Sequence, residues 1–327
     1  MKKQDLSYLM RFELVDAGVK SGEAIVLAVS GGPDSMALLD VARRLQPQVG
    51  WNLIVVHINH GLRAQSKQEA KLVKKYCERY DLGCVVKVIN LPVRVKQQST
   101  RVEETAREFR YRALRQIVKQ KKARLIVTAH NADDQVETIV LNFLRGSGIR
   151  GLGGMRNVSG DIIRPWLTVP KRELLQYVKQ HKVPFAVDAT NTSTKFTRNR
   201  VRHKLLPVLR EYNSQLDELL LHNSQLFQQA DIVLRNDARE LLGLMGTGKS
   251  GKVNLSISRL SELLPLMRVE VIRMAIEQVA GTTYNWKGSH FAEIAKLMTS
   301  RCLKSQKRLP GKLLVRRAYD KITISQE

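Results

Sequence analysis

Short runs of aliphatic and β-branched residues recur through the first 130 positions, and a segment with helical periodicity follows each of them. The apolar runs predict strands at 24–28, 53–58, 84–89 and 125–129. The helical segments are predicted at 36–45, 66–80 and 101–120, with a further helix that ends at Leu144. Strands that alternate with helices in this way indicate βαβ units, and therefore an α/β fold with a parallel sheet and helices on both faces.

The second half of the chain has a different pattern. A long amphipathic helix is predicted over 216–244, and short strands follow at 252–255, 313–316 and 321–325. Helices at 260–279 and 289–298 separate these strands, which is typical of a small α+β domain. A length of 327 residues fits about two domains. We therefore expect a first domain at 1–212, a helical linker at 213–245 and a small carboxy-terminal domain at 246–327.

The most informative turn lies between the first strand and its helix, at Ser30-Gly31-Gly32-Pro33-Asp34-Ser35. Two glycines permit positive φ and let a ligand approach the backbone closely. The N–H groups of such a turn and of the helix start point at one spot, which suits a phosphate. A plain connection needs one glycine and an N-cap, whereas small or capping residues fill five of these six positions. The stretch therefore favours a phosphate site.

No lysine follows this turn, so it is not a Walker loop. Its sequence resembles instead the pyrophosphate loop, SGGxDS, of the N-type ATP pyrophosphatases. Members of that superfamily cleave ATP between the α and β phosphates and adenylate an oxygen of their substrate. Residues 243–250 do fit the Walker letters, but a predicted helix precedes them where a strand is required. We interpret that segment as an interdomain turn.

Two more polar clusters directly follow predicted strands, at 57–63 and 130–137. The carboxyl ends of parallel strands share one edge of the sheet, so both clusters should lie beside the Ser30 turn and form one site. Each cluster alone also has a plain explanation. His57 and His60 fit solvated loop histidines, and the acids of the second cluster fit the positive end of a helix dipole.

Asp134 and Glu137 are i,i+3 neighbours on the helix that opens the second cluster, and they stand off its apolar face. Carboxylate oxygens are preferred ligands of Mg²⁺, which also binds substrate phosphates. With the Ser30 turn opposite, these acids are therefore placed to hold Mg²⁺ against the phosphates of ATP.

The charge balance indicates the class of partner. The chain has 55 lysines and arginines against 30 acidic residues, a formal net charge of +25. Nucleic acid is the leading candidate for a polyanionic partner, with a generally basic proteome as the plain alternative. Aromatic residues make up only 6% of the chain, so contacts to shape and phosphate are favoured over base stacking.

The three cysteines, Cys77, Cys84 and Cys302, match no zinc or iron–sulfur spacing and fit a reducing compartment. The amino terminus lacks the apolar core of a signal peptide, and no apolar run approaches the 18 residues of a membrane span. The sequence therefore predicts a cytoplasmic protein without a membrane partner. The oligomeric state stays open, a homodimer included.

Two basic segments and a glycine-rich loop are candidate RNA contacts. Residues 94–124 carry 11 basic and 3 acidic side chains, and 171–210 carry 10 and 2. Guanidinium groups favour bidentate phosphate contacts, although a solvated helix face would explain the same charges. The loop 145–155 holds five glycines and fits either a hinge or a gate that contacts RNA.

Taken together, these motifs are similar to those of the tRNA(Ile)-lysidine synthetase family. The match runs in order over about 24–210, and the most specific parts are TAHNADDQVET followed by LRGSGIRGLGGM. The resemblance implies a Rossmann-like sheet of the adenine nucleotide alpha hydrolase type and a tRNA-binding carboxy-terminal domain. It also implies a C–N bond-forming ligase. ATP adenylates the C2 oxygen of the wobble cytidine in the CAU anticodon of tRNA(Ile), and free L-lysine then attacks C2 and displaces AMP to give lysidine.

The same resemblance assigns roles to residues of this sequence. The catalytic group is Asp34, Asp134 and Arg202, with Asp34 and Asp134 also as ligands of Mg²⁺. The group that binds ATP is Ser30, Gly31, Gly32, Pro33, Asp34, Ser35, His57, Asn59 and His130. The group that contacts lysine or tRNA is Arg107, Arg110, Arg112, Glu137, Arg145, Arg198, Arg200 and Arg202. Which of Arg200 and Arg202 steadies the tRNA or the adenylate is left open.

Three other functions fit this sequence less well. A tRNA thiolase of the same superfamily would use the same activated carbonyl, but such enzymes usually carry paired cysteines, which this chain lacks. A small-molecule amidating synthetase fits poorly with a net charge of +25. A non-catalytic RNA-binding protein fits poorly with a complete set of polar residues at the strand ends.

Overall fold

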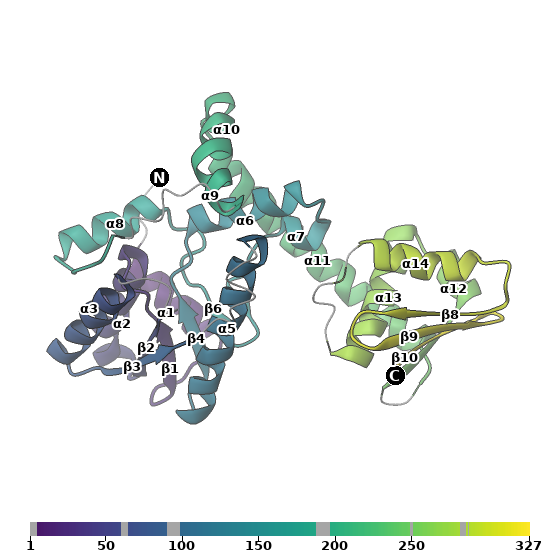
Figure 1. Cartoon of the computed structure of the whole chain (residues 1–327), viewed down its shortest axis with the longest axis horizontal. Coiled ribbons are helices and arrows are strands. Elements are labelled where there is room, and N and C mark those ends of the chain that lie inside the picture. Colours follow the sequence, from purple (N-terminus) through teal and green to yellow (C-terminus); the bar gives the residue numbers. More distant parts are fainter. Residues whose placement is uncertain are drawn as a thin grey trace. The chain divides into compact units, whose positions relative to one another are not determined.

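The computed structural model describes residues 5–59, 65–89, 99–187, 197–248, 251–281, 286 and 288–327 (Figure 1). For 65–66 and 99–104 it describes the backbone alone. The chain forms two compact units, Met1–Phe227 and Gln228–Glu327. Within the described part, no helix is both long enough and apolar enough to span a membrane.

The first unit is built on a six-stranded sheet with the order β3-β2-β1-β4-β6-β5. All neighbouring strands are parallel except β5 and β6. The strands are β1 (Ala24–Ala28), β2 (Asn52–Asn59), β3 (Gly83–Val88), β4 (Leu125–Thr128), β5 (Val158–Ser159) and β6 (Ile162–Ile163). The four strands predicted from the apolar runs are confirmed. Sequence patterns did not indicate β5 and β6, because two residues are too few to show an alternation.

Alternate residues of each central strand face two separate helical layers. In β1, Ile25 and Leu27 join the larger apolar core, whereas Val26 joins the core on the opposite face. The larger core is covered by α1 (Leu6–Asp16), α2 (Pro33–Val49), α3 (Gln65–Arg79) and α8 (Lys171–Gln180), and the other by α5 (Ser99–Gln120). Both faces of the sheet are therefore dry, as a parallel sheet requires.

A buried carboxylate connects α8 to the neighbouring helices α2 and α3. Asp40 of α2 is 1% exposed and accepts hydrogen bonds from the hydroxyls of Tyr76 (2.6 Å) and Tyr177 (2.7 Å). Arg43 and Arg44 bind the same carboxylate. Burial alone would raise the pKa of Asp40, but these four hydrogen bonds lower it to about 2. Helices α2, α3 and α8 are thus joined at one point.

Asp40→Asn should therefore destabilise the protein in a pH-dependent way. The folded pKa lies below the unfolded value, so the carboxylate stabilises the fold above about pH 4, and this contribution disappears as the pH falls towards 2. We expect the variant to lose about 2 kcal/mol of unfolding free energy at pH 7. Urea denaturation of both proteins at pH 7 and at pH 3 measures it. If the difference in unfolding free energy between the two proteins is as large at pH 3 as at pH 7, the stabilisation does not come from the Asp40 carboxylate.

The second unit is an antiparallel sheet with the order β7-β10-β9-β8, packed against helices. Its elements are the end of α11 (Leu216–Met245), β7 (Lys252–Ser256), α12 (Ile257–Glu262), α13 (Pro265–Ala280), α14 (Gly288–Thr299), β8 (Lys304–Leu309), β9 (Leu313–Ala318) and β10 (Lys321–Gln326). The predicted helix at 260–279 is wrong as a single element. Pro265 starts a new helix, because proline suits a first helical turn but breaks an interior.

Candidate functional site

The site lies where the strand order of the first sheet reverses. β1 pairs with β2 on one side and with β4 on the other. The loops that leave the carboxyl ends of β1 and β4 therefore separate at this point and leave a crevice, where α/β folds bind ligands. One loop leads to α2. The other leads to α6 (Ala132–Leu144), which begins above the strand ends (Figure 1).

The loop after β1 is shaped by the hydroxyl of Ser35. Its Oγ accepts the N–H groups of Ser30 and Gly31, both at 3.1 Å, and donates to the carbonyl of Gly32 at 3.0 Å. Gly31 has φ +95°, a conformation that favours glycine. The two N–H groups converge as predicted, but in this conformation they converge on a side chain of the protein. Gly32 then caps α2, and Pro33 occupies its first turn.

Asn131 connects the two loops. Its side chain and that of Asp134 form a reciprocal capping box at the start of α6, with bonds of 3.1 and 3.2 Å. The Nδ2 of Asn131 also donates to Oδ2 of Asp34 at 3.2 Å. Asn131 therefore holds the predicted acids Asp34 and Asp134 on opposite sides of the crevice. Asn131 was not among the predicted site residues, although its N-x-x-D spacing to Asp134 is that of a capping box.

The acids of the crevice disfavour one another's ionisation. Burial, followed by the charges of Asp134 and Asp133, raises the pKa of Asp34 to about 6 against the opposing effects of Lys171 and Arg202. Burial also raises the pKa of Asp134, with the charge of Glu137 adding to it and Arg198 opposing it. Oδ1 of Asp34 is buried and has no hydrogen-bond partner. An unpaired carboxylate oxygen on a residue that feels the charges of two further aspartates fits a divalent cation.

The donor set is too small to hold such an ion alone. Among the described residues, no group of three or more histidine, cysteine, aspartate or glutamate side chains is arranged around a metal position. Mg²⁺ commonly takes one or two carboxylates and completes its octahedron with phosphate oxygens and water. Asp34 and Asp134 therefore suit Mg²⁺ that arrives with a phosphorylated ligand.

The raised pKa of Asp34 makes its contribution to stability measurable. Between about pH 4 and pH 6 the folded protein keeps a proton that the unfolded chain has lost, so the unfolding free energy falls as the pH rises. The expected loss is about 3 kcal/mol. Asp34→Asn removes this titration. In chemical denaturation, the unfolding free energy of the variant should therefore rise relative to that of the parent protein between pH 4 and pH 7. Mg²⁺ added together with ATP should stabilise the parent at pH 7 more than it stabilises the variant.

Glu137 is held between two arginines. Its carboxylate is 2% exposed and accepts hydrogen bonds from Arg198 Nε at 2.8 Å and Arg202 Nη2 at 3.1 Å, with Arg202 Nε also bound. Both arginines also lie near Oδ1 of Asp134, at 3.1 and 3.6 Å. Arg200, between them in sequence, is exposed and bonds Thr197. The structure thus places Arg198 and Arg202 at the crevice, and Arg200 outside it.

A widened helical turn presents these arginines. Arg198 belongs to α9 (Thr197–Arg200), and Arg202 to the π-helical turn η2 (Val201–Leu205), which precedes α10 (Leu206–Tyr212). The N–H of Leu206 bonds the carbonyl of Val201, five residues back. Pro207 has no N–H to continue an α-helical ladder and its ring crowds the carbonyl four residues back. The turn therefore widens before it, as happens often at functional sites.

Of the predicted histidines, His57 is buried and His130 is half-buried, and both are kept neutral. Burial lowers the pKa of His57, whose Nδ1 lies 3.0 Å from the carbonyl of Val29. Burial lowers the pKa of His130 further, assisted by the charges of Arg107, Arg164, Arg110 and Arg198. His130 Nδ1 bonds the hydroxyl of Thr128 at 2.8 Å. Neither ring therefore carries a proton charge at neutral pH.

Arg164, whose charge acts on His130, was not among the predicted site residues. It is 5% exposed, donates to the carbonyl of Arg156, and has a buried Nε without a partner. Burial lowers its pKa, and a hydrogen bond to Tyr111 opposes that effect. The guanidinium Cζ atoms of Arg107 and Arg110 lie 5.4 and 5.8 Å from the centroid of the Tyr111 ring. The only signal for Arg164 in the sequence was the Arg164-Pro165 pair at a predicted sheet edge.

Two predicted contacts lie away from the crevice. Arg112 is exposed on α5 and stacks over Phe109, and Arg145 is exposed at the far end of α6. Asn59 is buried at the end of β2. His60 and residues 188–191 lie outside the described residues.

The glycine-rich loop is fastened to α6. Gln135 bonds the carbonyl of Met155 at 2.9 Å and its N–H at 2.8 Å, and Asn142 bonds the carbonyl of Gly151 at 2.7 Å. The segment contains a short helix, α7 (Ile149–Leu152). A Cβ at Gly154, where φ is +64°, would lie 2.7 Å from Gln135 Nε2. These contacts favour a packed element over a free hinge.

Comparison with known proteins agrees with this architecture. The model of the PP-loop domain family matches residues 6–209. The U34-tRNA thiolase NcsA of Methanococcus maripaludis, solved with its 4Fe-4S cluster, superposes with a TM-score of 0.57 over 68% of this chain and 78% of that one. Its sequence identity is 16%, so this likeness shows the fold alone.

Curated relatives narrow the family. The tRNA(Ile)-lysidine synthase of Thermosipho africanus is 36% identical over 62% of this chain and 48% of its own length, so the chain spans about half of that relative. The tRNA(Ile)-lysidine synthase of Clostridioides difficile is 30% identical over 94% of this chain and 68% of its own length. The chain therefore belongs to the PP-loop domain family and, within it, to the family of tRNA(Ile)-lysidine synthases.

Proposed function

We propose that the chain ligates free lysine to C2 of the wobble cytidine of tRNA(Ile) with a CAU anticodon, with release of AMP and pyrophosphate. The observation that carries the proposal is the pair of acids across the crevice. Asp34 and Asp134 are linked through Asn131 and lie beside the turn at Ser30–Ser35. The names of the curated relatives support the substrate. The cytoplasm is the compartment that this substrate requires.

The first half-reaction makes an inert oxygen into a leaving group. The turn at Ser30–Ser35 and the start of α2 would receive the pyrophosphate end of ATP, with Lys171 adding positive charge 3.9 Å from Asp34. Asp34 and Asp134 would hold Mg²⁺, which would neutralise phosphate charge as the α–β bond breaks. Arg198 and Arg202 stand next to Asp134, where they would bind the phosphate that remains on the cytidine.

The second half-reaction needs a neutral amine. The reference pKa of lysine is about 10.4, so deprotonation at pH 7 costs about 4.6 kcal/mol. Asp134 and Glu137 are the candidate bases. Asp134 suits the role better, because burial raises its pKa and its carboxylate accepts a hydrogen bond from Arg198 alone of the two arginines, whereas Glu137 accepts hydrogen bonds from both. We propose that Asp134 accepts the proton of the attacking amine.

The decisive experiment measures AMP release from ATP by the purified protein. We expect release that requires both tRNA(Ile) with a CAU anticodon and L-lysine, with lysidine detected in the digested tRNA. Elongator tRNA(Met), which shares the CAU anticodon, is the control and should support little release. A requirement for a sulfur donor would identify a thiolase, and release without tRNA a small-molecule synthetase. No release with any substrate would leave a non-catalytic RNA-binding protein.

We also propose that the second unit contacts the tRNA. Residues 301–327 carry 8 basic and 2 acidic side chains, and β8 places Lys304 and Arg308 on exposed positions of its sheet. Phosphate contacts of this kind weaken as salt displaces them.

A further inference from the structure

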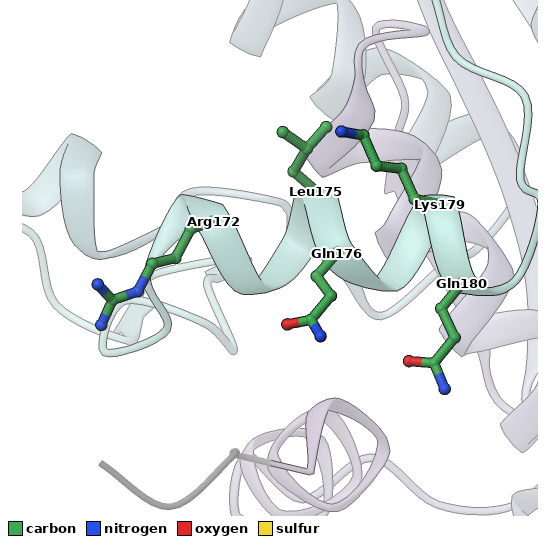
Figure 2. Close-up of a pocket in the computed structure, with 5 residues that line it drawn as sticks. All are labelled: Arg172, Leu175, Gln176, Lys179 and Gln180. Carbon is green, nitrogen blue, oxygen red and sulfur yellow. The ribbon is translucent and has the colours of Figure 1, made fainter.

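The outward face of α8 carries a cleft of about 750 Å³. Figure 2 shows its lining side chains in two rows along the helix, with Leu175 and Lys179 on one side and Arg172, Gln176 and Gln180 on the other. The spacing of four residues within each row places successive side chains on the same strip of the helix. The cleft is therefore elongated and follows the helix axis.

The helix under this cleft is firmly mounted. Leu174 and Val178 on its inner face are fully buried in the larger core of the first unit. The hydroxyl of Tyr177 donates to the buried carboxylate of Asp40 at 2.7 Å. The lining side chains therefore project from a rigid support, which lowers the entropy lost when a ligand is bound.

One end of the cleft borders the crevice. The N–H of Lys171, the residue before Arg172, donates to Asp133 Oδ2 at 2.8 Å, and its Nζ lies 3.9 Å from Asp34 Oδ2. At a rise of 1.5 Å per residue, Arg172 and Lys179 are separated by about 10 Å along the helix axis. The cleft thus leads away from the site along a line with two cationic side chains.

The lining has the chemistry of a nucleic-acid strand contact. Arg172 and Lys179 are exposed cations, and none of the five lining residues is acidic. Arginine and lysine bind separate phosphates. The amides of Gln176 and Gln180 can donate to and accept from ribose hydroxyls and base edges, and Leu175 offers an apolar contact to a base. The cleft is open along its length, which suits a strand better than an enclosed small molecule.

We propose that this cleft binds the single-stranded RNA segment that flanks the nucleotide in the crevice. The proposal rests on the proposed function, because it takes the tRNA as the substrate. It assigns the α8 face a part in substrate binding and no part in the reaction. The substrate constant should therefore depend on Arg172 and Lys179, while the rate at saturation should not.

The test is the double variant Arg172→Ala/Lys179→Ala. For a single-stranded nucleic acid, each phosphate contact contributes about 0.7 to the steepness of log K against log salt concentration. Loss of two contacts should therefore make this slope shallower by about 1.4. At 0.15 M salt this corresponds to a dissociation constant raised roughly tenfold. Binding of an anticodon stem–loop RNA is measured across a salt series, together with kcat and KM for full-length tRNA. The expected result is a raised KM with kcat retained.

A charge-matched control separates this effect from net charge. Lys119 and Lys121 belong to the basic segment 94–124, but they are exposed at the opposite, amino-terminal end of the strands. Lys119→Ala/Lys121→Ala should therefore leave the dissociation constant within about twofold of the parent. Equal salt slopes for both double variants would overturn the proposal while leaving the proposed function intact. If the parent protein itself binds no tRNA, the proposed function fails, and this inference fails with it.

Discussion

Asp134→Asn should lower the rate of tRNA- and lysine-dependent AMP release by about a thousandfold at pH 7.5. The substitution removes the group proposed to accept the amine proton and one of two carboxylates proposed for Mg²⁺. Asparagine has the same shape and still offers an oxygen to the N–H of Asn131, so the capping box of α6 can persist. Single-turnover AMP release at saturating substrates measures the chemical step, and circular dichroism confirms the fold.

Asp133→Asn is the matched control for that experiment. Asp133 is the preceding residue, and its carboxylate accepts the N–H of Lys171 at 2.8 Å. It contributes charge to the crevice but is not assigned a contact with substrate, so its rate should stay within about tenfold of the parent. A rate near that of the parent for Asp134→Asn would exclude the proposed base and return Glu137 to consideration.

Glu137→Gln should destabilise the first unit by about 3 kcal/mol. Its carboxylate is 2% exposed and faces Arg198 and Arg202, which are 22% and 27% exposed. Removing the negative charge leaves two partly buried guanidinium groups with only Asp134 to balance them, and an uncompensated buried charge is costly. Guanidinium chloride denaturation measures the difference, with ionic strength fixed by added salt.

The control for this prediction lies on the same helical segment. Arg200 is exposed and bonds only Thr197 among the described residues, so Arg200→Gln should change the unfolding free energy by less than about 0.5 kcal/mol. If Glu137→Gln is as stable as Arg200→Gln, the two arginines are not held by Glu137. Their position beside Asp134 would then need another explanation.

The parts of the site that sequence analysis found are those with strong local signals. The apolar run before Ser30 stops at two glycines, and the acids of α6 follow directly on a second buried run. Both features are read within ten residues, and parallel topology brings them together without further information. The predicted sheet is confirmed for the same reason.

The parts that were missed depend on contacts between distant segments. Arg164 lies at the end of a two-residue strand and meets α5 through Tyr111. The choice among Arg198, Arg200 and Arg202 depends on the π-helical turn, whose cause, Pro207, stands after the arginines rather than among them. Strand β8 was missed because Lys304–Leu309 is polar and mostly exposed, so it lacks the apolar alternation of a strand.

The hydroxyl of Ser35 has a consequence for how nucleotide affinity arises. It already satisfies two main-chain donors of the turn, so an arriving phosphate oxygen would replace one acceptor with another. An exchange of this kind changes the number of hydrogen bonds little and contributes little net free energy. Affinity at this turn should therefore follow the charge of the nucleotide. Removing one phosphate from the nucleotide should weaken its binding more than removing the Ser35 hydroxyl does. Ser35→Ala should lower the stability of the turn more than it lowers the affinity for the nucleotide.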